Sequence, residues 1–207
     1  YALVDGLSQD DLSELEPFMM RRCAVAGVDG VIAARTGYTG EDGFELYIPA
    51  AHAVSIWRAL HELGVTPCGL GARDSLRLEM KYALYGNDID EQVNPIEAGL
   101  GWICKDKIKE FIGADAVRAA RRDKPQRKLV GLVLDGRRVA RTGSPVVGPD
   151  GQVIGRVTSG AFSPSLKKSI AVALVPREFA PIETSLGVDI RGRVHQAEVV
   201  KTPFYKR

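Results

Sequence analysis

Cysteine is scarce in this sequence. The 207 residues contain three cysteines, Cys23, Cys68 and Cys104. They are widely spaced, their number is odd, and none belongs to a C-x-x-C pair, so neither a disulfide framework nor a structural zinc site is expected. No metal is therefore predicted, and a reducing compartment suits the sequence best.

Long apolar runs and a dominant sign of charge are also lacking. No apolar run approaches the ~20 residues that a membrane-spanning helix needs. Lys and Arg number 28 against 26 Asp and Glu, which gives a formal net charge of +2. This balance gives no general reason to expect a nucleic acid or a membrane as a partner.

An initiating Met and a basic-then-apolar leader are missing at the start of the sequence. The chain begins with Tyr1, and its first residues read as the middle of a longer polypeptide. We therefore interpret the start of the sequence as the result of a truncation or a cleavage.

The first half of the sequence mixes helix and strand patterns. Ser8 with the acidic residues after it predicts a short helix that Pro17 closes. Apolar positions at steps of three and four predict helices, and short apolar runs predict strands. The predicted strands cover residues 31–36 and 44–49, and the predicted helices cover residues 51–63, 72–84 and 113–122.

The pattern changes after a basic, polar stretch at residues 121–128. Strand-like runs then recur about every ten residues, which is typical of a small antiparallel barrel or sandwich. Residues 148–151 (GPDG) predict a tight hairpin between two of these strands. The predicted strands cover residues 129–134, 152–158, 169–175 and 194–201, and the expected domains cover residues 1–124 and 125–207.

A glycine-rich loop precedes the first candidate binding residue. Residues 37–43 (GYTGEDG) include three glycines but have neither the P-loop nor the dinucleotide-binding spacing. Tyr38 could stack on a flat ring, and Glu45 alternates with apolar neighbours, so it faces away from them. A carboxylate on a strand suits a ligand with adjacent N–H donors, but a plain hairpin with a surface Glu fits the same pattern.

Two arginines lie four residues apart in the predicted helix at residues 72–84. Arg73 falls near the helix N-terminus, where an anion is favourably received, and a guanidinium can fork onto a carboxylate. The alternative is an ordinary helix in which Arg77 pairs with Asp74. The sequence leaves both readings open.

Three other sets of residues are more typical of a structural role than of ligand binding or catalysis. The acidic cluster at residues 88–91 lacks the ligand spacing of a calcium loop, so a solvated, hydrogen-bonded turn is expected. Residues 158–168 contain two lysines that could bind an anion, but a connection between barrel strands is favoured. His52 and His61 fall in the predicted helix at residues 51–63 and His195 in a predicted strand, without a partner that indicates metal or triad chemistry.

Six sequence blocks together resemble the glycine cleavage T-protein family. They occur in the family's order along the chain. The blocks are residues 37–45 (GYTGEDGFE), 69–79 (GLGARDSLRLE), 84–91 (LYGNDIDE), 157–160 (VTSG), 163–168 (SPSLKK) and 203–205 (PFY).

The resemblance implies an enzyme, a tetrahydrofolate-dependent aminomethyltransferase. Such an enzyme takes an aminomethyl group from the lipoyl arm of the H-protein, transfers the one-carbon unit to tetrahydrofolate and releases ammonia. The implied fold is α+β, an incomplete α/β folate-binding core followed by a C-terminal antiparallel β-barrel. The implied location is the cytoplasm in a bacterium or the mitochondrial matrix in a eukaryote.

The resemblance also assigns site residues. Glu45 is expected to hold the pterin and Tyr38 to lie beside the folate, with Arg73 and Tyr82 contributing to the same site. The catalytic carboxylate of the family is an aspartate in its N-terminal segment. Nothing in this sequence matches that segment, so no catalytic residue is assigned, and the chain alone is expected to be inactive.

Three alternatives remain open from the sequence. One is the folate domain of a dimethylglycine or sarcosine dehydrogenase relative, and another is a non-catalytic folate-binding module of the iron–sulfur maintenance type. The third is an inactive remnant that keeps part of the folate pocket. Unpaired sheet edges in an incomplete core would also favour self-association.

Overall fold

The chain forms two compact units. The computed structural model describes residues 4, 6–8, 10–105 and 111–206. By backbone contacts the units are Tyr1–Arg73 and Asp74–Arg207. This division falls within one helix, whereas the change in sequence pattern suggested a boundary at residues 124–125, which stays a prediction.

The N-terminal unit is built on a three-stranded antiparallel sheet in the order β1-β2-β3. The strands are β1 (Met20–Val25), β2 (Val28–Ala34) and β3 (Glu45–Tyr47). A two-residue turn joins β1 to β2, and both of its residues, Ala26 and Gly27, have positive φ, as such tight hairpins require. The sequence predicted β2 and β3 but not β1.

The helix predicted after Ser8 is wrong. Among the described residues from 6 to 17 the chain has turns and one isolated bridge, between Ser8 and Val25. The hydroxyl of Ser8 accepts a hydrogen bond from the backbone N–H of Asp10 at 3.1 Å, and Asp11 makes the equivalent bond to the N–H of Ser13 at 2.9 Å. These polar side chains stabilise local turns in place of a helix.

One helix covers the small sheet. The short 3-10 helix η1 (Ala50–His52) leads into α2 (Ala53–Glu62), close to the predicted range. Its apolar spacing buries Ile56 at 1% exposure. The core beneath consists of Leu12, Cys23, Val25, Val28, Val31, Ala33 and Ile56.

Two further helices were predicted. The helix α3 (Leu70–Glu79) ends earlier than the predicted residue 84, and α4 (Ala114–Asp123) agrees closely with its predicted range. After α3 the chain turns through Lys81, whose φ of 54° is incompatible with a continuing right-handed helix.

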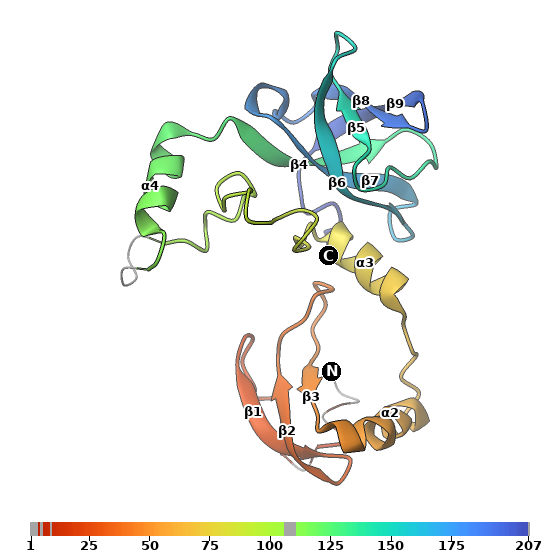
Figure 1. Cartoon of the computed structure of the whole chain (residues 1–207). Helices are drawn as coiled ribbons and strands as arrows, with labels where there is room; N and C mark the ends of the chain where they lie inside the picture. Colours follow the sequence, from red (N-terminus) through yellow and green to blue (C-terminus); the bar gives the residue numbers. More distant parts are fainter. Residues whose placement is uncertain (1–3, 5, 9, 106–110, 207) are drawn as a thin grey trace. The chain divides into compact units, whose positions relative to one another are not determined.

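The C-terminal unit contains a closed antiparallel barrel, in the order β4-β7-β6-β5-β8-β9. Its strands wrap around a common interior in Figure 1. The strands are β4 (Arg127–Leu134), β5 (Pro145–Val147), β6 (Val153–Ser163), β7 (Lys168–Pro176), β8 (Ser185–Ile190) and β9 (Arg193–Val200). The α+β class and the C-terminal barrel are thus confirmed.

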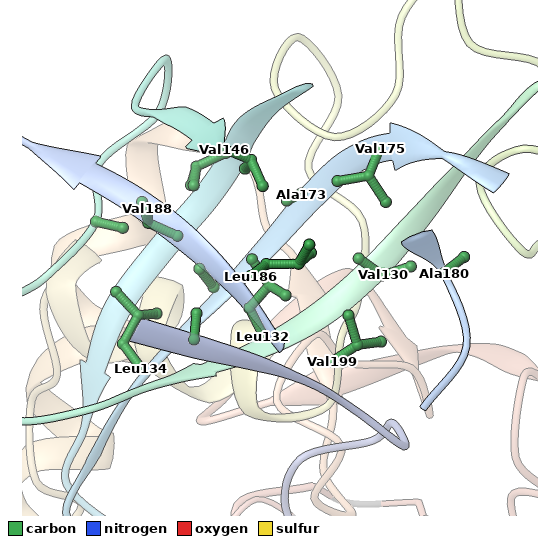
Figure 2. Packing of buried hydrophobic residues seen from close by; sticks show 14 residues of the cluster. Val130, Leu132, Leu134, Val146, Ala173, Val175, Ala180, Leu186, Val188 and Val199 are labelled. Atoms are coloured by element: carbon green, nitrogen blue, oxygen red, sulfur yellow. The ribbon is translucent and has the colours of Figure 1, made fainter. Parts of the chain in front are cut away.

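The barrel is filled by the inward-facing side chains of its strands. Figure 2 shows Leu132, Val146, Leu186 and Val188 among the residues that gather inside it. These four are 0–2% exposed. Side chains alternate between the inside and the outside of the barrel along each strand, so the alternation determines which residues form this core.

The predicted hairpin at residues 148–151 is confirmed. The backbone N–H of Gly148 donates to the carbonyl of Gln152 at 2.9 Å, and Gly151 supplies a φ of 82°. The favoured reading of residues 158–168 is also correct, because Lys168 opens β7 directly after the turn that follows β6.

Candidate functional site

Glu45 stands where the glycine-rich loop returns to the sheet. It is the first residue of β3 and pairs in register with Ala34 of β2. Its side chain is exposed, and its carboxylate accepts a hydrogen bond from the hydroxyl of Thr36. The strand therefore fixes the backbone of Glu45 while its carboxylate remains open to a ligand.

The base of this loop is fastened by an ion pair. The guanidinium of Arg35 forks onto Asp42, with Nε–Oδ1 at 3.0 Å and Nη2–Oδ2 at 2.9 Å. Its Nη1 also donates to the carbonyl of Leu15 at 2.7 Å. The hydrogen bonds from Arg35 hold the pKa of Asp42 below its usual value. The ends of the loop are thus pinned together.

Tyr38 and Arg73 come together in the N-terminal unit. The guanidinium carbon of Arg73 lies 4.5 Å from the centroid of the Tyr38 ring, which is a cation–π arrangement. Arg73 lies in the first turn of α3, where the sequence placed it. The contact orients the guanidinium and puts a cation beside the glycine-rich loop.

Tyr82, the fourth predicted binding residue, belongs to the C-terminal unit. Its side chain is 38% exposed. Its backbone is held by Arg77 twice: its N–H donates to the Arg77 carbonyl at 2.8 Å, and its carbonyl accepts from Arg77 Nη1 at 3.2 Å. Arg77 therefore fixes the point from which the Tyr82 ring projects.

Arg77 takes part in a buried ion pair that the sequence did not indicate. Its Nη1 lies 2.8 Å from Oδ2 of Asp88, and the two side chains are 2% and 1% exposed. Its Nη2 donates to the hydroxyl of Ser159 at 2.9 Å, and that hydroxyl donates to Asp88 at 2.9 Å. The predicted pairing of Arg77 with Asp74 is also present, at 2.6 Å.

The prediction of a solvated, hydrogen-bonded turn is wrong in one respect, because the side chain of Asp88 is buried at 1% exposure, although it is hydrogen-bonded. Both carboxylate oxygens of Asp88 are engaged, because the Thr158 hydroxyl donates to Oδ1 and the Leu84 N–H donates to Oδ2 at 2.9 Å. A buried carboxylate requires such partners, since leaving it unpaired costs several kcal/mol. The acidic loop thus anchors α3 and the barrel strand β6 to each other.

Glu79 forms a second buried polar contact. The hydroxyls of Ser163 and Ser165 donate to its two carboxylate oxygens, the latter at 2.9 Å. Its backbone carbonyl accepts from the N–H groups of Phe204 and Tyr205, at 2.9 and 3.1 Å. Glu79 therefore joins three of the distinctive sequence blocks, at residues 69–79, 163–168 and 203–205, through hydrogen bonds inside this unit.

Lys81 lies on the turn after α3. Its ammonium group donates to the carbonyl of Ala98 at 3.4 Å. Burial lowers the pKa of Lys81, the neighbouring Lys128 adds to this effect, and Asp88 opposes it.

Within the described ranges, no group of three or more His, Cys, Asp or Glu could hold a metal ion. The helices of the described part are also all too short or too polar to cross a bilayer.

Family models match most of the chain. Residues 2–107 match a family described as the GCVT N-terminal domain, and residues 127–206 match the glycine cleavage T-protein C-terminal barrel domain.

Curated relatives agree with these matches. A protein named aminomethyltransferase from Symbiobacterium thermophilum is 50% identical over 201 residues, which cover 94% of this chain and 53% of the relative. Another of that name, from Shouchella clausii, is 45% identical over 211 residues, covering 100% of this chain and 57% of the relative. The chain thus spans about half the length of the curated relatives that it matches.

A solved structure is similar in both sequence and fold. The crystal structure of glycine cleavage system aminomethyltransferase T from Bartonella henselae has a TM-score of 0.91 and 33% sequence identity, covering 99% of this chain and 56% of that one. The two family matches, the relatives and this structure agree, and the chain belongs to the glycine cleavage T-protein family.

Proposed function

We propose that this chain contributes part of the folate site of a tetrahydrofolate-dependent aminomethyltransferase. The reaction moves a one-carbon unit from the aminomethyl group on the lipoyl arm of the H-protein to tetrahydrofolate and releases ammonia. Membership of the T-protein family and the names of the relatives support this proposal. The compartment would be the bacterial cytoplasm or the mitochondrial matrix, according to the source.

The observation that carries the proposal is the exposed Glu45 carboxylate at the start of β3. A pterin presents an amino group and a ring N–H side by side. A carboxylate can accept both bonds at once, and charge-assisted bonds of this kind are the stronger ones. The register with Ala34 and the bond from Thr36 hold the carboxylate for such a ligand without burying it.

Arg73 and Tyr38 suit other parts of the same ligand. Tetrahydrofolate ends in a p-aminobenzoyl-glutamate portion with carboxylates, which a guanidinium complements. The Tyr38 ring, held against Arg73 at 4.5 Å, offers a flat surface beside the loop. Tyr82 is proposed as a further folate contact from the C-terminal unit.

Asp88 is unsuited to the role of catalytic carboxylate. It is 1% exposed, and both of its oxygens accept hydrogen bonds within the C-terminal unit. A general base or a positioning carboxylate must reach the reacting nitrogen. The catalytic residue therefore remains unassigned on this chain, and turnover by the chain alone is not proposed.

Calorimetric titration with tetrahydrofolate tests the proposal. Glu45→Ala should weaken binding at least tenfold, because removal of a charge-assisted bidentate contact costs about 1.5–3 kcal/mol. Glu62→Ala, which removes an exposed carboxylate at the end of α2, is the matched control and should bind like the parent.

The titration should be run on this chain and on a longer chain that spans the full length of the relatives. Equal affinity of the Glu45→Ala variant and the parent in the longer chain would refute the pterin assignment. Failure of both parent chains to bind tetrahydrofolate would refute the proposed function itself.

A further inference from the structure

A cationic hollow lies at one end of the barrel, entirely within the C-terminal unit. It has a volume of about 710 Å³ and is formed by the β4–β5 connection and the β8–β9 hairpin. Its polar lining consists mainly of the side chains of Arg137, Arg138, Arg141, Arg191, Arg193 and His195.

Because side chains alternate along a strand, some of the lining side chains face the mouth of the barrel. Along β9, Arg193 and His195 are in the same row as Ala197 and Val199, which belong to the barrel core. The inward-facing row thus becomes basic where the apolar core ends. The mouth of a barrel is a common place for a ligand, because the strands form its walls and the core forms its floor.

The floor of the hollow is apolar. Ile190 lines it and packs against the core cluster, and it shares the inward row of β8 with the fully buried Val188. Asp189, between them, points to the other face of the strand. Its carboxylate accepts the N–H of Gly192 at 2.7 Å, so it serves the hairpin turn.

The charge of the hollow is local. The whole chain has a formal net charge of only +2, yet five arginines line this one depression. Among its described lining residues none is acidic. A concave surface lined by one sign of charge concentrates the potential and attracts the opposite charge.

The arginines are also suited to recognition. Arg137 lies with its guanidinium carbon 5.5 Å from the Phe162 ring centroid, which limits its motion. Guanidinium groups bind carboxylates and phosphates with two parallel hydrogen bonds each. Several such groups around one opening favour a ligand with more than one anionic group.

We propose that this mouth of the barrel binds a polyvalent anion that carries carboxylate or phosphate groups. None of its lining residues is assigned to tetrahydrofolate, and its occupancy does not depend on that assignment. The apolar floor gives the ligand a surface to lie on, and the arginines neutralise its charges.

Isothermal calorimetry on the 207-residue chain at low ionic strength tests the proposal, with pyrophosphate as the phosphate probe and citrate as the carboxylate probe. At least one probe should bind saturably. The Arg191→Glu/Arg193→Glu variant should weaken that binding at least tenfold, since it places two negative charges in the hollow. The probe that binds more tightly identifies the preferred anionic group.

The matched control is Arg156→Glu/Arg177→Glu, which makes the same change of net charge at exposed positions of the C-terminal unit outside the hollow. It should bind within about twofold of the parent, since screened charges at a distance have little effect. If the first variant fails to fold, Arg191→Gln/Arg193→Gln replaces it. Absence of saturable binding to the parent, or an equal loss in the control, would overturn the proposal.

Discussion

Arg77 and Asp88 neutralise each other inside the C-terminal unit, and their hydrogen bonds reach three separate parts of the chain. The pair joins α3, the loop before Asp88 and β6 through Ser159. It also fixes the backbone of Tyr82. A buried pair of this kind adds little net stability over apolar side chains of the same volume, but the loss of one partner leaves the other charge buried and uncompensated.

Removing one partner should therefore be costly. Asp88→Ala leaves the Arg77 cation without its buried counter-charge and with only the exposed Asp74 beside it, so the unfolding free energy of this unit should fall by about 3–5 kcal/mol. Asp90→Ala, which removes a carboxylate that accepts the nearby Gln92 N–H, should cost about 1 kcal/mol. Urea denaturation followed by circular dichroism measures both.

A second substitution separates the buried charge from simple loss of packing. Adding Arg77→Met to Asp88→Ala should recover part of the lost stability, since no buried unpaired charge then remains and Asp74 is exposed to solvent. The interpretation fails if Asp88→Ala costs no more than Asp90→Ala.

At the scale of single elements, β6 approaches its neighbours too closely for side chains at certain positions. A Cβ on Gly160 would lie 2.0 Å from the carbonyl oxygen of Ala140. The obstacle is backbone, so the strand or the β4–β5 connection would have to move.

Gly160→Ala should accordingly lower the unfolding free energy of the barrel by about 1–3 kcal/mol or more. Gly69→Ala is the control, because nothing lies within 4 Å of its added Cβ and its φ is ordinary. Its effect should stay within about 0.5 kcal/mol. Thermal unfolding of both variants measures the difference, and similar melting temperatures would contradict the close approach.

The spacing of apolar residues predicted those helices and strands in which the apolar residues are also the buried ones. The apolar spacing of α2 and the runs of β6 and β7 were sufficient for this. The sequence did not predict β1, because only its last three residues are buried, nor β8, where Gly187 and Asp189 interrupt the strand pattern. In both strands, pairing with neighbours outweighs local preference.

The local sequence likewise predicted some features of the candidate site and not others. The exposed Glu45 at the start of β3 and the place of Arg73 in the first turn of α3 follow from local pattern. The burial of Asp88 does not, because its partners Arg77 and Ser159 lie 11 and 71 residues away. No local spacing indicates a contact over such a separation, so Asp88 reads as a solvated residue of an acidic loop.

The two units differ in how their sheets end. The barrel closes on itself, so each of its strands has a partner on both sides. The sheet of the N-terminal unit is open, and its order makes β1 and β3 the outer strands. Next to and within β1, the side chains of Phe18, Met19 and Met20 are 87%, 57% and 72% exposed.

An open edge beside exposed apolar side chains favours pairing with another chain, because backbone hydrogen bonds and apolar burial then form together. We therefore expect the chain to self-associate as its concentration rises. Met20→Lys should shift it towards monomer, since a charge on an edge strand opposes such pairing. Val54→Lys, at a 60% exposed position on α2, is the control and should leave association unchanged. Sedimentation velocity over a range of concentrations measures this, and a parent chain that remains monomeric throughout would refute the expectation.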